Sequence, residues 1–303
     1  MSLLSPTHPL DTLLVLVFLA ANLIVGFWSR GRSHTFREYA VGDKKFSTPV
    51  LTATIVATWM SGSIFFIVLE HTYTDGLYYA IAIMGLPLSL LITGLIIGPR
   101  MGKFLNNVSV PHILGDQYGP SVQVIAGISA TLHALGYIAG QFKAISRITE
   151  ILLGYAGSEV TIVTAVLVIL YSTSGGVKAV TFTDVVQFFT FGTLIPVLAL
   201  AVWTHMGETA PAQVTAVFNN DPRFSFRSVM QWTPVFRGTL ILLGYYMVPY
   251  LTTGIFQRMA MARNVKQIRE SFMWATALCL GVVLCIIWLA TLLLADQPGL
   301  ENK

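Results

Sequence analysis

The sequence predicts an all-α, polytopic membrane protein. Of its 303 residues, 54% are hydrophobic and only 11% are charged, whereas a soluble domain carries about 25% charged residues. Eight apolar runs approach or exceed the length of about 20 residues that a helix needs to cross a bilayer. A helix satisfies all of its backbone hydrogen bonds internally, as a lipid environment requires. The length of this chain is therefore interpreted as a number of membrane spans and not as a number of soluble domains.

The expected spans are, in chain order, Leu10–Trp28, Val50–Leu69, Leu77–Ile97, Val122–Leu153, Val160–Thr173, Thr183–Trp203, Pro234–Gly254 and Phe272–Leu294. The fourth run is long enough to cross at a tilt, and the fifth is short unless neighbouring polar residues extend it. The polar segment from His205 to Thr233 is expected to contain a short helix at the membrane interface.

Basic residues indicate how these spans are oriented. Most of them follow the odd-numbered runs, at Arg30, Arg32, Arg37, Lys44, Lys45, Arg100, Lys103, Lys178, Arg258, Arg263, Lys266 and Arg269. By the positive-inside rule, these loops face the cytoplasm and the N-terminus lies outside. The net charge of +4 is thus a topology signal, and we expect membrane lipid rather than nucleic acid as a partner.

Two of the runs contain helix-breaking residues. Ser61 and Gly62 interrupt the second run, while Pro249 and Gly254 interrupt the seventh. Proline removes a backbone donor and glycine tolerates non-helical angles. The two runs are five spans apart and cross in opposite directions, a pattern typical of transporters built from inverted five-helix repeats. The alternative is that small residues allow close helix packing.

One acid, Asp184, opens the sixth run. A Gly175-Gly176 pair precedes it, which predicts a tight turn at a membrane surface within Tyr171–Gln187. Acids at membrane depth are costly and usually functional. The alternative is that Thr183 and Asp184 cap the start of the helix.

Several motifs together resemble the sodium:solute symporter family. The strongest is GG-x-x-AV-x-x-TD-x-x-Q, from Gly175 to Gln187. Similar family segments are Phe36–Phe46, Ala57–Ser63, the fourth helix around Arg147, Glu150 and Gly154, and the pair Gln257 and Arg258. The resemblance spans nearly the whole chain in the family's order.

This resemblance implies a LeuT-type inverted-repeat fold of about thirteen helices, of which residues 1–303 supply about eight. These would be an extra N-terminal helix, a complete first five-helix repeat and the start of the second repeat. The family's sodium site takes hydroxyl ligands from a helix beyond this point. We therefore expect either a fragment or a partner that supplies the rest.

The resemblance also implies site residues. Backbone carbonyls of Ala57 and Met60 would hold sodium, and Asp184 would lie on the inner cation path. Residues expected to face the solute are Ser61, Gln141, Tyr245, Tyr246, Tyr250 and Thr253. Ordinary helix packing remains the alternative for Ala57 and Met60, and interfacial anchoring for the three tyrosines.

The predicted function is sodium-coupled symport of a small organic solute, such as an amino acid or a carboxylate, across a bacterial inner or plasma membrane. The alternative is a transporter-like sensor module of a membrane signalling protein such as a histidine kinase. An enzyme is not expected, because the sequence has neither HExxH nor GxSxG. No cofactor or catalytic residue is predicted beyond sodium as the coupling ion, and the solute, the stoichiometry and the oligomeric state stay open.

Overall fold

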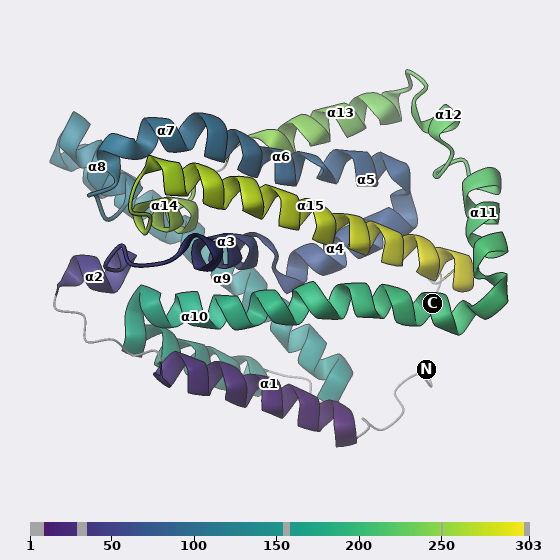
Figure 1. Cartoon of the computed structure of the whole chain (residues 1–303), viewed down its shortest axis with the longest axis horizontal. Coiled ribbons are helices and arrows are strands. Elements are labelled where there is room, and N and C mark those ends of the chain that lie inside the picture. Colours follow the sequence, from purple (N-terminus) through teal and green to yellow (C-terminus); the bar gives the residue numbers. More distant parts are fainter. Residues whose placement is uncertain (1–8, 29–34, 154–157, 250, 300–303) are drawn as a thin grey trace. The chain divides into compact units, whose positions relative to one another are not determined.

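The predicted apolar runs form helices in the computed structural model, which describes residues 9–28, 35–153, 158–249 and 251–299 (Figure 1). No strand occurs among these residues. The chain divides into two compact units, which are described in turn. The first comprises Met1–Thr54, Gly102–Val186 and Leu251–Asn264, and the second comprises Ile55–Met101, Gln187–Tyr250 and Val265–Lys303.

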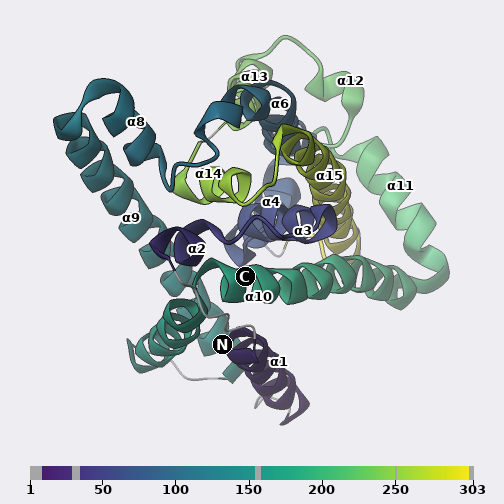
Figure 2. The same ribbon diagram turned by 60° about the vertical axis from the view of Figure 1, so that its left-hand side comes forward.

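The first unit is built around a long helix, α9. Its helices are α1 (Pro9–Trp28), α2 (Phe36–Val41), α8 (Val110–Tyr118), α9 (Pro120–Leu153), α14 (Thr253–Ala260), the first part of α3 (Thr48–Trp59) and the first part of α10 (Ser158–Met206). Helix α8 packs against α9, α1 also contacts α9, and α2 contacts α14 (Figure 2).

The second unit is organised along α15 (Val265–Asp296), the yellow helix of Figure 1. Its other helices are α4 (Gly62–Asp75), α5 (Leu77–Ile83), α6 (Gly85–Ile92), the π-helix Thr93–Ile97, α7 (Gly98–Arg100), α11 (Ala210–Asn220), α12 (Phe226–Val229) and α13 (Pro234–Met247). The remaining parts of α3 and α10 also belong to it, as do the 3-10 turn Gly207–Thr209 and, at its edge, the 3-10 turn Met101–Phe104. Helix α15 contacts α4, α6 and α11, while α13 contacts α5 and α6. Helices α11 and α12 fall in the polar segment where the sequence predicted a short helix.

Four of these described helical stretches are long and apolar enough to cross a membrane, or five when the bent pair α3 and α4 is counted as one. The stretches are Leu77–Phe104, Pro120–Ser146, Gly175–Asn220 and Val265–Asp296. Many large apolar side chains on α9 and α10 are exposed. Such a surface is unfavourable in water and is typical of helices that face lipid. The architecture is that of an integral, multi-pass membrane protein.

In the structure, the helices that contain the fifth and sixth predicted spans extend toward each other and meet at a single residue, Gly176. Its φ of 59° and ψ of −154° are the only non-helical angles inside α10, so the turn is narrower than the sequence indicated. A Cβ at Gly176 would lie 2.6 Å from the backbone oxygen of Tyr39. The Tyr39 hydroxyl donates to the Thr173 carbonyl at 3.0 Å, which holds α2 against this break.

We expect replacement of Gly176 by Ala to destabilise the protein by about 1–3 kcal/mol or more, because this backbone region is essentially restricted to glycine. Denaturant unfolding in detergent micelles measures the change. Gly281→Ala in α15 is the matched control, since a Cβ there meets nothing within 4 Å. Equal stability of the two variants would contradict the assignment of Gly176 as a required break.

Loops that the charge pattern assigned to one membrane side meet in the first unit. Arg37 Nη2 donates to the Leu105 carbonyl at 3.1 Å, and Lys44 Nζ donates to Asn106 Oδ1 at 3.0 Å. Arg263 Nη2 donates to the Lys45 carbonyl at 2.9 Å. The bond from Tyr39 to Thr173 described above is the fourth of these contacts. Segments following the first, third, fifth and seventh predicted spans are thus joined directly, so they share one side.

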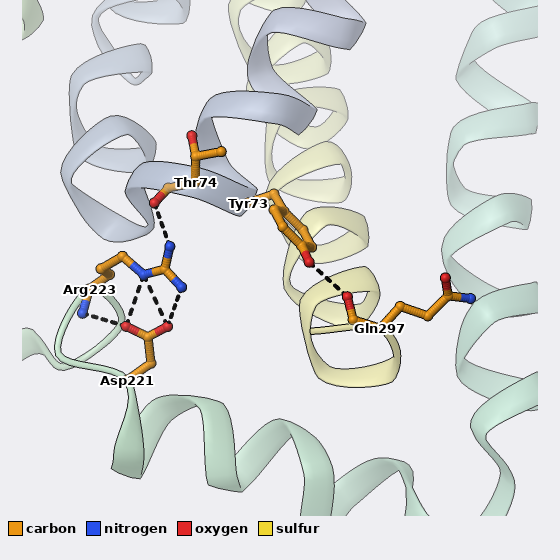
Figure 3. Close-up of polar contacts among 5 residues, drawn as sticks. All are labelled: Tyr73, Thr74, Asp221, Arg223 and Gln297. Atoms are coloured by element: carbon orange, nitrogen blue, oxygen red, sulfur yellow. Dashed lines mark hydrogen bonds and ion pairs between the residues drawn. The ribbon is translucent and has the colours of Figure 1, made fainter. Parts of the chain in front are cut away.

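Segments assigned to the other side meet in the second unit (Figure 3). Arg223 Nη1 donates to the Thr74 carbonyl at 2.7 Å. The Tyr73 hydroxyl donates to the Gln297 carbonyl, also at 2.7 Å. These bonds join the segments that follow the second, sixth and eighth predicted spans, again in agreement with the charge pattern.

Candidate functional site

The first predicted helix interruption lies between α3 and α4, at Met60 and Ser61, where the two helices are bent by 58°. Ser61 is extended, with φ −95° and ψ 163°, and its hydroxyl accepts from the Ile64 amide at 3.3 Å. In an uninterrupted helix that amide would donate to the Met60 carbonyl. Ala57 lies in the last turn of α3, where carbonyls lack intrahelical donors. The break therefore presents backbone oxygens near both predicted ligand positions.

A cavity of about 230 Å³ opens beside this break in the second unit. Met60, Ser61 and Phe65 line it from the broken helix, and Thr190 and Phe191 line it from α10. Most of its walls are apolar, with hydroxyl groups from one serine and one threonine. The structure thus brings two predicted residues, Met60 and Ser61, to one cavity.

The second predicted interruption lies between α13 and α14. Helix α13 ends at Met247, and Val248 is extended, with ψ 121°. Pro249 follows within the break, and the Thr252 hydroxyl then caps α14 by accepting from the Ile255 amide at 3.3 Å. Both interrupted segments that the sequence predicted are therefore present, although Gly254 lies inside α14 and does not interrupt it. Tyr250, predicted to face the solute, lies outside the described residues.

Two other predicted tyrosines lie together at the end of α13. The rings of Tyr245 and Tyr246 meet at 5.6 Å between centroids. The Tyr246 hydroxyl lies 3.2 Å from the hydroxyl of Tyr79 on α5, a residue that the sequence did not single out. Tyr245 is 71% exposed. Tyr246 is thus fixed by a specific partner, whereas Tyr245 presents its ring outward from the second unit.

Gln141 and Thr253 lie in the first unit. Gln141 is half-buried on α9, and Thr253 is the exposed first residue of α14. Neither is among the residues that line the cavity beside Met60 and Ser61.

Asp184 belongs to a buried polar group in the first unit. It lies inside α10, eight residues after the break at Gly176, so the alternative that it caps a helix is wrong. The Thr54 hydroxyl donates to Asp184 Oδ2. Arg258 Nη2 donates to the same oxygen at 2.8 Å. The side chains of Arg258 and Asp184 are only 6% and 13% exposed, so they form a buried ion pair.

Arg258 is held in turn by its neighbour. Its Nη1 donates to Gln257 Oε1 at 2.9 Å, and Gln257 Nε2 donates to the Ala40 carbonyl at 2.5 Å. Arg258 Nε is buried and has no hydrogen-bond partner within the described part of the chain. The Asp184 carboxylate therefore joins α3, α10 and α14, and Gln257 extends the cluster to α2. The guanidinium of Arg258 balances the charge of the carboxylate.

Sequence reasoning placed Arg258 among the basic loop residues and did not assign Thr54 a role. A signal for both existed, since a buried carboxylate requires a cationic partner and hydrogen-bond donors. The choice of partner was not encoded locally, because Thr54 and Arg258 lie 130 and 74 residues from Asp184 in sequence.

Comparison with protein-family models gives a match to the sodium:solute symporter family over residues 39–299. The chain belongs to this family. The symporter-family match includes both interrupted helices, the Gly176 break and the cluster around Asp184.

This symporter-family chain is similar in sequence to two curated transporters. It is 22% identical over 236 residues to high-affinity choline transporter 1 of Drosophila melanogaster, covering 76% of this chain and 37% of the relative. It is also 22% identical over 280 residues to the high-affinity proline transporter PutP of Bacillus subtilis, covering 86% of this chain and 57% of the relative. The chain thus spans between about a third and three fifths of the length of these relatives.

The fold of this symporter-family chain is similar to that of a solved sodium-coupled sialic acid symporter. The TM-score is 0.82 at 16% sequence identity, and the similarity covers 94% of this chain and 61% of that one. The predicted all-α, LeuT-type fold is therefore confirmed.

Proposed function

We propose that this chain forms part of a secondary active transporter that couples sodium entry to uptake of a small organic solute. Pro9–Trp28 is assigned to the extra N-terminal helix, the helices through Met206 to the first five-helix repeat, and α13 to α15 to the start of the second. The choline and proline named in the relatives are both small organic solutes, which supports the solute class.

The observation that carries the proposal is the interruption at Met60 and Ser61 in a chain that matches the symporter family. Sodium is a hard cation that prefers oxygen ligands, and the carbonyls of Ala57 and Met60 lie at the negative end of α3. Ser61 opens α4, whose N-terminal amides favour negative or polar solute groups. One break thus offers complementary ends to an ion and to a solute.

Asp184 is proposed to lie on the path by which sodium leaves toward the cytoplasm. Its position beside the joined basic loops of the first unit supports this assignment. Those loops are proposed to face the cytoplasm by the positive-inside rule, which places the N-terminus outside.

The solute is proposed to contact Ser61, Gln141, Tyr245, Tyr246, Tyr250 and Thr253. Hydroxyl groups at helix breaks, an amide and aromatic rings suit a small polar molecule with an apolar body. The cavity beside Ser61 and the fixed position of Tyr246 support the assignment.

Uptake by the intact protein in sealed proteoliposomes tests the function. We expect at least one labelled solute from a panel of amino acids, quaternary amines and small carboxylates to accumulate only under an inward sodium gradient. Potassium in place of sodium is the control for ionic strength. Uptake that does not respond to the sodium gradient across the whole panel would contradict the proposal.

A further inference from the structure

A second cavity, of about 320 Å³, lies in the second unit where the turn between α4 and α5 meets α13. Its walls include Asp75 at the end of α4, Tyr78 and Tyr79 of α5, Arg223, and Thr239 and Leu242 of α13. This volume falls within the range of small-molecule sites. None of the six is proposed to contact the transported solute, although Tyr79 hydrogen-bonds Tyr246, which is.

The rim of this cavity is firmly held. The Leu77 amide donates to the Arg223 carbonyl at 3.0 Å. Gly76 has a φ of 64°, and a Cβ there would lie 2.6 Å from that same oxygen, so only glycine permits this close approach. The Arg223 side chain also donates to the Thr74 carbonyl (Figure 3). The cavity is therefore formed before any ligand arrives, which reduces the cost of binding.

The charge of Arg223 is already matched by Asp221, which does not line the cavity. Arg223 Nε lies 3.1 Å from both carboxylate oxygens, and Nη2 lies 2.7 Å from Oδ2 (Figure 3). Partial burial acts to raise the pKa of Asp221, but its hydrogen bonds with Arg223 and the guanidinium charge lower it overall. Asp221 is thus ionised at neutral pH, and the pair is electrically neutral.

Asp75 is then the carboxylate that gives the cavity its charge. Its side chain is 52% exposed and contacts His71 Nδ1 at 2.9 Å. The His71 ring stacks on Tyr79 with centroids 4.8 Å apart. The Asp75 carboxylate therefore lies beside aromatic rings, with His71 as its contact among the side chains described here.

A carboxylate next to aromatic rings and an apolar wall favours a particular ligand chemistry. Aromatic faces attract cations, and aliphatic side chains such as Leu242 favour methyl and methylene groups. A bare metal ion would need several oxygen ligands, and no group of three His, Cys, Asp or Glu side chains gathers around a common point within the described residues.

We propose that this cavity binds a small organic ammonium cation. The Asp75 carboxylate supplies the counter-charge, and Tyr78 and Tyr79 supply the aromatic walls. Thr239 offers a hydroxyl to a polar substituent on the ligand. The site is distinct from the break at Met60 and Ser61 and does not depend on transport.

Binding of radiolabelled tetramethylammonium to the intact protein in nanodiscs, in sodium-free buffer, tests the proposal. We expect saturable binding that Asp75→Asn weakens at least tenfold and Tyr78→Leu weakens about threefold to tenfold. His71→Gln should leave binding unchanged or strengthen it, because it removes a competitor for the carboxylate. Potassium chloride supplies charge without methyl groups and tert-butanol supplies methyl groups without charge, so neither should displace the probe at matched concentration.

Asp116→Asn is the matched control. Asp116 also contacts a histidine four residues away, His112, and its side chain is 59% exposed, but it lies on α8 in the first unit. This variant should bind the probe normally. Absent binding, equal effects of Asp75→Asn and Asp116→Asn, or binding lost in Ser61→Ala but kept in Asp75→Asn would each overturn the proposal. Sodium-driven uptake, measured separately, can persist or fail in any of these cases, so the two proposals are tested independently.

Discussion

Replacing Arg258 with Met should lower the free energy of unfolding by about 3–5 kcal/mol, the loss observed when one partner of a buried ion pair is removed. The pair with Asp184 is buried on both sides, with side-chain exposures of 6% and 13%. Without the guanidinium, the carboxylate keeps only the Thr54 hydroxyl as its donor among the contacts described above. A buried charge with one neutral donor is strongly unfavourable.

Denaturant titration of the intact protein in detergent micelles measures this loss. The double variant Asp184→Asn with Arg258→Met should regain a large part of the stability, because it removes both charges. A double-mutant cycle then gives the coupling between the two positions directly.

Lys266→Met is the control for loss of a salt bridge as such. Lys266 pairs with Glu270 four residues away, but the two side chains are 84% and 45% exposed. Exposed pairs of this kind contribute about 0–1 kcal/mol. A cost for Arg258→Met no larger than that for Lys266→Met would show that the buried pair has no special role in stability.

Replacing Asp184 with Asn should raise the sodium concentration for half-maximal uptake at least tenfold. Asparagine keeps the shape of the side chain and an oxygen that accepts from Thr54, but it has no charge to attract a cation. At an effective dielectric constant of 20, two unit charges 4 Å apart interact by about 4 kcal/mol, so a tenfold effect is a conservative expectation.

Sodium-dependent uptake by the intact protein, corrected for the amount of folded protein, measures this effect. The correction matters because Asp184→Asn also leaves Arg258 without its carboxylate, which lowers stability. A change in the half-saturating sodium concentration separates cation binding from loss of folded protein, which lowers the maximal rate. Asp116→Asn, an exposed carboxylate on α8, is the matched control. Unchanged sodium dependence in Asp184→Asn would remove Asp184 from the cation path.

Much of the architecture was predictable from local chemistry. The apolar runs become helices because a chain in lipid must satisfy its backbone groups within each segment. Ser61 and Pro249 mark the two interruptions because serine caps a new helix and proline cannot continue the old one. The basic residues of the odd-numbered loops indicated that these segments share one side, and the hydrogen bonds from Arg37 and Arg263 join them.

The candidate site was predictable only in part. Met60 and Ser61 lie at a break beside a cavity, as expected of functional residues, while the ligand roles of Ala57, Met60 and Asp184 stay predictions. The two glycines at the fifth-to-sixth span junction are alike in sequence. Only the tertiary structure shows that Gly176 carries the positive φ, because the Tyr39 backbone packs against it.

The sequence by itself determined that this protein is a helical membrane protein with two broken spans, because hydropathy, charge bias and helix breakers act within short stretches of chain. Its motifs, from Gly175 to Gln187 above all, also resembled the symporter family, and the family match over residues 39–299 confirmed that resemblance. The tertiary structure alone decided which groups meet the charge of Asp184. Any of several basic residues satisfied the rule that a buried carboxylate needs a cation, and only the packing of α14 and α3 around α10 brings Arg258 and Thr54 to it. Such pairings depend on distances through space, which sequence spacing does not record.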